Sequence, residues 1–379
     1  MSTPKPIKID ADYLLETLET LLKIPSPSGR TDDVMHEIGR RFDALGVETE
    51  LTRRGALVAT IPGEGKAPCR AYTVHADTIG AMVRSITDNG RLKLAMVGTH
   101  PARSAEGATV KIFTDSVGVS YTGTILPLKA SGHAFGDEVD KQGWTWEDIE
   151  VRIDAPTSSA EDTRELGIQI GDFVALISFP RIDEHGFVNA RHLDGKAGVA
   201  SALAAVEALV REKVRPPVDT HVLVTIAEEV GQGASSGLHE DVAEMIAIDN
   251  AVVAPGQASR EDAVSVCMLD SSGPTDYHLS RKLLMLAAEH DIDVVRDVYR
   301  YYRADIAAAI EAGAEMRVAL LGFGVDGSHG HERTHRDSLV GLAELVTIHA
   351  QTPLTFSWDE SPRGPLAEFP EQTDEPEKP

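Results

Sequence analysis

Apolar residues recur at helical spacing in two segments near the start of the chain, and short apolar runs follow them. Residues 10–23 and 31–45 predict two amphipathic helices, separated by the Pro/Ser/Gly turn IPSPSGR. The runs VETELT, GALVATIPG and RAYTVHADTIG then predict strands, and the last of these ends at His75 and Asp77. This order of elements is typical of the first part of an α/β domain.

The pattern changes in the middle of the chain, over residues 85–183. Short strand-like runs, such as TVKIFT, GVSYTGTIL, IEVRIDA and DFVALISF, are divided by Gly, Pro and Asp. The segment SSAEDTRELG predicts one short helix with a serine at its amino end and an acidic residue downstream. We therefore expect a small inserted β domain, resembling a barrel or a sandwich.

After residue 183 the alternation of helices and strands resumes. GKAGVASALAAVEALVRE, TDYHLSRKLLMLAAEHDI and SLVGLAELVTIHA predict helices, whereas THVLVTIAEE, EMIAIDNAVV, AVSVCMLD and EMRVALLGFGV predict strands. Short links between them favour a three-layer α/β sandwich. The predicted main domain is discontinuous, formed by residues 1–84 and 184–357, and the Pro-rich, acidic residues 358–379 predict a disordered tail.

Composition narrows the choice of partners and compartment. The chain has 379 residues and a formal net charge of -24, so phosphate-rich partners such as nucleic acids or anionic membranes would be repelled. Cys69 and Cys267 cannot build a disulfide framework, no apolar signal core is visible at the start, and no run approaches a membrane span. These features predict a cytoplasmic protein.

Polar side chains follow the predicted strands at the points where the strands end. Each has an ordinary explanation alone: an Asp before a helix is usually a cap, and adjacent glutamates usually lie on the surface. However, the glutamate pair directly follows the apolar run HVLVTIA, where two carboxylates are unexpected. Because the carboxyl ends of strands in an open α/β sheet share one edge, we expect these side chains to converge: His75, Asp77, Asp194, Glu228, Glu229, Asp249 and His335.

Two imidazoles and three carboxylates suit a pair of borderline divalent ions, with zinc and cobalt the first candidates. Such a pair needs one bridging carboxylate and a nearby base that is not itself a ligand. The adjacent glutamates offer this division: Glu229 would bind an ion while Glu228 accepts a proton from water.

These segments resemble the TET and glutamyl-aminopeptidase family of dinuclear metallo-aminopeptidases in clan MH. The similarity covers the His-x-Asp strand end at His75, the aspartate of LDGKAG, the Glu-Glu-Val-Gly motif that begins at Glu228, and Asp249 about twenty residues later. It also covers the insertion, where SSAEDTRELGIQIGDFV resembles the family's stretch before the bridging aspartate. The likeness thus extends over nearly the whole chain except its tail.

The resemblance implies a role for each residue. One ion would bind His75, Asp194 and Asp249, and the other would bind Asp194, Glu229 and His335. Asp77 would orient His75, and Glu228 would act as general base and then donate its proton to the leaving amine. In the family, the inserted domain helps to form dimers that assemble into a hollow dodecamer, which implies a homo-oligomer here.

Three departures from the family pattern leave alternatives open. Thr78 stands where an acidic residue is usual, and Gly195-Lys196 replaces the usual Asn or Asp followed by Arg. The closing segment GSHGHERTHRDS holds His329, His331 and His335; the distance to the following helix favours His335, with His331 as its competitor. These features resemble the branch associated with the N-acetylglutaminylglutamine amide osmoprotectant system.

The sequence therefore predicts an aminopeptidase acting on small peptides with two divalent ions per subunit. A deacylase or amidase of a small blocked dipeptide would use the same ions with a different pocket. A catalytically silent assembly or binding protein is a third alternative, although it would be expected to have lost the base or the bridge. A glycosidase is disfavoured, because its two acids must flank one sugar bond about 5 Å or more apart.

Overall fold

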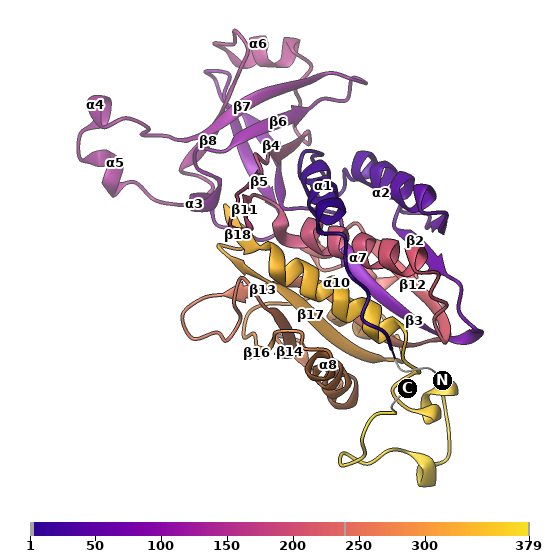
Figure 1. Cartoon of the computed structure of the whole chain (residues 1–379). Coiled ribbons are helices and arrows are strands. Elements are labelled where there is room, and N and C mark those ends of the chain that lie inside the picture. Colours follow the sequence, from indigo (N-terminus) through magenta and orange to yellow (C-terminus); the bar gives the residue numbers. More distant parts are fainter. Residues whose placement is uncertain (1–3, 239, 378–379) are drawn as a thin grey trace.

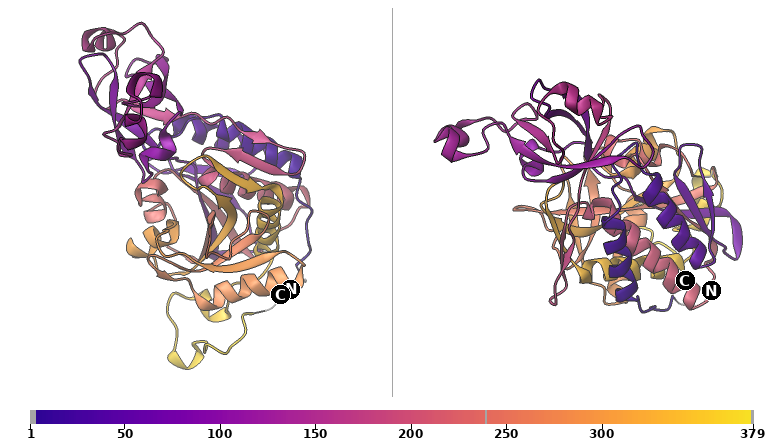
Figure 2. Two further views of the ribbon diagram at one scale, coloured as in Figure 1. Left: turned by 90° about the vertical axis from the view of Figure 1, so that its left-hand side faces the viewer. Right: turned by 90° about the horizontal axis from the view of Figure 1, so that it is seen from above.

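A computed structural model describes residues 4–238 and 240–377 as an α/β body with a small β-barrel at one end (Figure 1). The C-terminal segment lies at the other end of the body, beside the N-terminus, in every view (Figures 1 and 2). Among the described residues, the body contains a sheet of twelve strands and the barrel contains six.

Nine strands of the large sheet form its main path. In spatial order they are β1 (Glu48–Leu51), β2 (Leu57–Ile61), β12 (Val218–Thr225), β3 (Gly65–His75), β13 (Val242–Val253), β17 (Arg317–Asp326), β18 (Glu332–His335), β11 (Phe187–Ala190) and β10 (Arg181–Ile182). Strand β14 (Val264–Asp270) pairs with β17 and also with β15 (Gly273–Pro274) and β16 (Val294–Val298).

The four central strands β12, β3, β13 and β17 are parallel, so their carboxyl ends meet at one edge of the sheet. The residue pairing between neighbouring strands shows which side chains reach this edge together. Thr225 at the end of β12 pairs with His75, and Thr73 pairs with Ala247 on the opposite neighbour. His75 and Asp249 each lie two residues beyond that last pair, and therefore reach the same level of the edge.

Alternation along the strands divides the apolar side chains between two faces. On β3, Tyr72 and Val74 join the larger core, whereas Ala71 joins the smaller one. The larger core lies under the helices α1 (Ala11–Leu22), α2 (Asp32–Ala44), α7 (Leu193–Arg211), α8 (Tyr277–Glu289) and α10 (Arg336–Ala350). On the other face lies α9 (Asp305–Glu311), which the apolar pattern did not predict. The predicted α/β class, with helices on both faces of a sheet and an inserted barrel, is confirmed.

The barrel is closed by the strand order β4 (Gly80–Ile86), β5 (Leu92–Val97), β8 (Ile149–Ile153), β7 (Ser120–Pro127), β6 (Thr109–Phe113) and β9 (Phe173–Leu176). Its first strand begins at Gly80, whereas the predicted insertion begins at residue 85. Four short helices lie between these strands: α3 (Ala102–Ala105), α4 (Gly132–Phe135), α5 (Glu138–Lys141) and α6 (Ala160–Glu165). Ser159 caps α6 in a capping box with Asp162, as the sequence predicts.

A buried ion pair ties the centre of the sheet to the end of the chain. Arg70 on β3 and Glu244 on β13 are fully buried, with 2.5 Å between Nε and Oε1. Arg70 also donates to the backbone oxygens of His349, Thr352 and Pro353. The C-terminal segment beyond these residues contains two short turns of 3-10 helix, η3 (Ser357–Glu360) and η4 (Leu366–Glu368), and is mostly exposed.

Candidate metal centre

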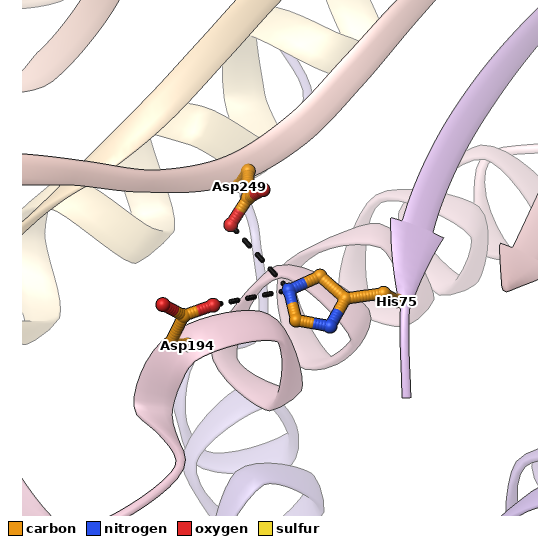
Figure 3. A group of neighbouring side chains, drawn as sticks. All are labelled: His75, Asp194 and Asp249. Atoms are coloured by element: carbon orange, nitrogen blue, oxygen red, sulfur yellow. Dashed lines mark hydrogen bonds and ion pairs between the residues drawn. The ribbon is translucent and has the colours of Figure 1, made fainter. Parts of the chain in front are cut away.

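Three side chains from separate elements meet at the carboxyl edge of the sheet (Figure 3). His75 ends β3, Asp249 lies on β13, and Asp194 lies at the amino end of α7. The Nε2 atom of His75 is 3.0 Å from Oδ1 of Asp194 and 3.5 Å from Oδ1 of Asp249. These three ligand atoms could therefore hold one ion.

A second group lies on the other side of Asp194. The Nε2 atom of His329 is 3.2 Å from Oδ2 of Asp194 and 3.3 Å from Oε2 of Glu229. Asp194 thus offers Oδ1 to the first group and Oδ2 to the second. This is the arrangement of a carboxylate that bridges two ions.

The backbone at the start of α7 is shaped to place Asp194. Asp194 has φ -58° and ψ 116°, and Gly195 has φ 15° and ψ -26°, so both depart from helical geometry. A β-carbon at position 195 would lie 2.5 Å from two ring carbons of His75. On the backbone of this chain, a residue larger than glycine at position 195 would therefore collide with the ring of His75.

A backbone oxygen orients each of the two histidines, His75 and His329, through its Nδ1 atom. Nδ1 of His75 lies 3.0 Å from the backbone oxygen of Asp77, and Nδ1 of His329 lies 2.6 Å from that of Thr99. Because a carbonyl oxygen only accepts, each Nδ1 carries the proton. When an ion takes the place of the second proton, the lone pair lies on Nε2, the atom that faces the carboxylates, as a metal ligand requires.

His335 does not lie in either group, so the prediction for the closing histidine is corrected to His329. The Nε2 atom of His335 is 2.8 Å from the backbone oxygen of His185, and its Nδ1 accepts from the Asp337 N–H at the start of α10. His331 is also outside both groups. His329 has a left-handed backbone with φ 60°, which spacing along the sequence does not reveal.

Asp77 has a wider role than orienting His75. Its backbone oxygen contacts the His75 ring, while its carboxylate is 3.7 Å from Nδ1. The same carboxylate accepts hydrogen bonds from the backbone N–H groups of Glu228 and Glu229 and from the Ser28 hydroxyl. Asp77 therefore fixes the segment that carries both glutamates.

The two adjacent glutamates face different surroundings. Oε1 of Glu229 accepts from the Ile79 N–H, which turns Oε2 toward His329. Among the described residues, no side chain donates a hydrogen bond to the Glu228 carboxylate. Burial raises the pKa of Glu228 well above its usual value, and the nearby carboxylates of Asp249 and Asp305 raise it further. Glu228 is thus placed to exchange a proton.

The charges of the centre are balanced by the two imidazoles. Burial alone would lower the pKa of His75, but the carboxylates of Asp249 and Asp194 outweigh this effect and raise it well above its usual value. His329 behaves in the same way beside Asp194, with its pKa raised to about 10. Burial and the neighbouring Asp194 raise the pKa of both Glu229 and Asp249. This concentration of carboxylates around two nitrogen ligands fits a pair of divalent cations.

Three further residues position Asp194 and were not singled out in the sequence. The Glu332 carboxylate accepts from the backbone N–H groups of both Asp194 and His329. Asn250 Nδ2 and Ser328 Oγ each donate to Oδ2 of Asp194, at 2.6 and 3.3 Å. Asn250 directly follows Asp249, and Ser328 and Glu332 lie on either side of His329. In the sequence, only this closeness to candidate ligands could have indicated the three residues.

The surroundings of the centre come from both parts of the molecule. Ile79 and Thr99, which contact Glu229 and His329, lie next to barrel strands β4 and β5. A cavity of about 580 Å³ lies elsewhere, at the amino ends of β3, β13 and β17, where Trp358 and Phe369 contribute to its lining. Within the described residues, none of the helices combines the length and apolar character needed to cross a bilayer.

Comparison with known proteins places these features in context. The family model for M42 glutamyl aminopeptidases matches residues 55–345. The chain is 40% identical over 340 residues to Bacillus subtilis YhfE, a protein named as a candidate aminopeptidase, covering 90% of this chain and 98% of that protein. A lysyl aminopeptidase of Pyrococcus furiosus is 26% identical over 188 residues, covering 48% of this chain and 50% of that protein.

Solved structures show the same fold. The TET aminopeptidase of a marine-sediment Thaumarchaeota archaeon superposes with a TM-score of 0.81 at 18% identity, covering 90% of this chain and 96% of that one. The TET1 peptidase of Pyrococcus horikoshii, which can assemble into a tetrahedron or a large octahedral shell, gives a TM-score of 0.77 at 23% identity, with coverages of 89% and 99%.

Proposed function

Because this chain belongs to the M42 glutamyl aminopeptidase family, we propose that it is a metal-dependent aminopeptidase that removes N-terminal residues from small peptides. The observation that carries the proposal is the pair of ligand groups joined by the two oxygens of Asp194. A structural ion site would need only one such group, whereas a hydrolytic centre benefits from two adjacent ions.

In this proposal, His75, Asp194 and Asp249 hold one divalent ion, and Asp194, Glu229 and His329 hold the other. Zinc and cobalt suit this mixture of imidazole and carboxylate ligands. Bound ions at these positions would polarise the scissile carbonyl and make a water acidic enough to react at neutral pH.

Glu228 performs the proton transfer. Its carboxylate accepts a proton from the attacking water and passes that proton to the nitrogen of the leaving amine. Glu228 belongs to neither ligand group, so its carboxylate is available for this double task. Asp77 supports the transfer by holding the backbone of Glu228 through its own carboxylate.

The substrate in this proposal is a short peptide with a free amino end. A deacylase of a small blocked dipeptide is the second candidate, favoured by Thr78, which stands beside the centre where an acid would attract an ammonium group. The suggested link to osmoprotectant dipeptides makes glutaminyl peptides suitable test substrates. The net charge of -24 disfavours nucleic-acid partners.

Assembly and location complete the proposal. The structural relative from Pyrococcus horikoshii can assemble into a tetrahedron or a large octahedral shell, and a TET1 structure of similar fold, PhTET1-12s, has a dodecamer in its asymmetric unit. We propose a homo-oligomer for this chain as well, acting in the cytoplasm.

The deciding experiment compares free and N-acetylated glutaminyl peptides of equal length, before and after removal of metal with a chelator. We expect hydrolysis of the free peptides only, loss of activity on chelation, and recovery with zinc, cobalt or manganese. Full activity in a demetallated sample would contradict the metal-dependent mechanism. Release of acetate from the blocked peptides alone would replace the aminopeptidase by the deacylase.

A further inference from the structure

Tyr302 has a buried hydroxyl group beside the metal centre that the proposed mechanism does not use. Its hydroxyl oxygen is inaccessible and has no hydrogen-bond partner among the described residues. An unpaired buried hydroxyl destabilises the folded protein, so such a group usually has a function or a partner in another state. The charged groups with the largest electrostatic effect on Tyr302 are the carboxylates of Asp249, Glu228 and Asp194, and Asp249 is also a hydrogen-bond neighbour of its hydroxyl.

The segment that carries Tyr302 is fixed at several points. Asp305, at the start of α9, accepts hydrogen bonds from the hydroxyls of Thr73 and Thr225 and from the Ala234 N–H. The Ser271 N–H donates to the Tyr302 backbone oxygen at 2.9 Å. Since Thr73 and Thr225 lie on the strands that lead to His75 and Glu228, Tyr302 is held in register with the metal centre.

Asp249 has one oxygen in use and one available. Its Oδ1 is 3.5 Å from Nε2 of His75 and accepts from the Asn250 N–H at 2.6 Å. Among the described residues, nothing donates a hydrogen bond to its Oδ2. Figure 3 shows only one Asp249 oxygen turned toward His75. An unpaired donor on Tyr302 and an unpaired acceptor on Asp249 are therefore neighbours.

We propose that Tyr302 is a positioning residue for the metal centre, whose O–H donates to Oδ2 of Asp249 and so presents Oδ1 as a single-oxygen ligand. Hydrogen bonds to ligand carboxylates fix their orientation and commonly change metal affinity by about 10–100-fold. A phenol has a pKa of about 10 in water, so the hydroxyl carries its proton at neutral pH and can act as a donor. This inference rests on the proposed two-ion function.

Tyr299 provides a matched control for removing the hydroxyl of Tyr302. The two rings pack edge to face with 5.2 Å between their centres, and both are part of the same packed region. However, the Tyr299 hydroxyl is bonded to the Ser259 hydroxyl at 2.6 Å, away from the carboxylates of the centre. Tyr299→Phe makes the same chemical change without altering Asp249.

The test is calorimetric titration of demetallated wild type, Tyr302→Phe and Tyr299→Phe with zinc, with thermal unfolding of each metal-free protein as a check of folding. We expect two binding steps in all three, with one step weakened about 10–100-fold in Tyr302→Phe alone. Metal-free Tyr302→Phe should unfold at about the same temperature as metal-free Tyr299→Phe, because each variant loses one hydroxyl hydrogen bond.

A double variant separates positioning of Asp249 from a general loss of structure. If Tyr302 acts through Asp249, adding Tyr302→Phe to Asp249→Asn should weaken zinc binding by less than about threefold beyond Asp249→Asn alone. Wild-type zinc affinities in Tyr302→Phe, or full additivity in the double variant, would overturn the inference. Failure of the proposed function would be seen separately, as the absence of zinc binding by wild type itself.

Discussion

At the scale of single residues, the centre depends on which atom of each side chain is left free. Backbone oxygens bind the Nδ1 atoms of His75 and His329 and leave Nε2 for an ion. Glu332 holds the backbone N–H of Asp194, and Asn250 and Ser328 hold its Oδ2, so the carboxylate is fixed with Oδ1 toward His75. Hydrogen bonds from residues outside the two candidate ligand groups thus fix the orientation of the candidate ligand atoms.

The choice between the closing histidines gives the first prediction. His329→Ala should remove one of two bound ions, because it deletes the only nitrogen ligand of the group formed with Asp194 and Glu229. His335→Ala is the matched control and should retain both ions, since its ring contacts the backbone of His185 instead. The metal content of each variant, measured by mass spectrometry, distinguishes the two histidines. Loss of an ion from the His335 variant, and not from the His329 variant, would identify His335 as the ligand, as the sequence predicted.

The glutamate pair gives the second prediction. Glu228→Gln should keep both ions but lower kcat by about 10²–10⁴-fold, because it removes the base without touching a ligand. Glu229→Gln should lower the occupancy of one ion site, as its Oε2 faces His329. Parallel measurement of kcat and metal content tests both, and equal behaviour of the two variants would refute the division of roles.

The limits of prediction are clear at this scale. The sequence pointed to His75, Asp194, Glu229 and Asp249 because each lies in or next to a strongly patterned strand or helix. The closing histidine was misplaced because the one that joins the cluster, His329, lies in an irregular loop with a left-handed backbone at that residue. The number of residues between a histidine and the next helix does not give the position of its side chain in space when the loop between them is irregular.

At the scale of elements, parallel pairing creates the site. β12, β3 and β13 are in register so that His75, Asp249 and the segment after Thr225 reach the same edge. Long apolar strands and helices were predicted well from periodicity, because their burial sets the pattern. The short helix Asp305–Glu311 was not predicted; its role depends on Asp305, whose partners lie more than seventy residues away.

The buried ion pair at the other end of these strands gives the third prediction. Glu244→Gln should lower the free energy of unfolding by about 3–5 kcal/mol, because it leaves the Arg70 guanidinium buried without its partner. Burial alone would raise the pKa of Glu244, but Arg70 outweighs it and holds that pKa well below its usual value. Its contribution is therefore complete above about pH 5 and is lost as the pH falls further.

Chemical denaturation at several pH values measures this contribution. The difference between wild type and Glu244→Gln should be largest near neutral pH and shrink in acid. Glu147→Gln is the control, since Glu147 pairs with Arg84 at the exposed surface and should change stability little. A pH-independent difference, or a similar loss in both variants, would contradict the assigned role of the ion pair.

At the scale of the whole molecule, the barrel and the α/β body share the centre. Ile79 and Thr99, which flank the first barrel strands, contact Glu229 and His329, so the insertion contributes to the site as well as to the architecture. The sequence predicted the class of each part, because alternation and helical spacing differ between them. It could not predict the contact between the parts, which depends on backbone atoms that carry no sequence signal.

The central claim is that one chain holds two divalent ions on either side of Asp194, and anomalous scattering from crystals of the zinc-loaded protein tests it most directly. The account predicts two peaks about 3.5–4 Å apart, one beside His75 and Asp249 and the other beside Glu229 and His329. A single peak, or a second peak beside His335, would contradict it.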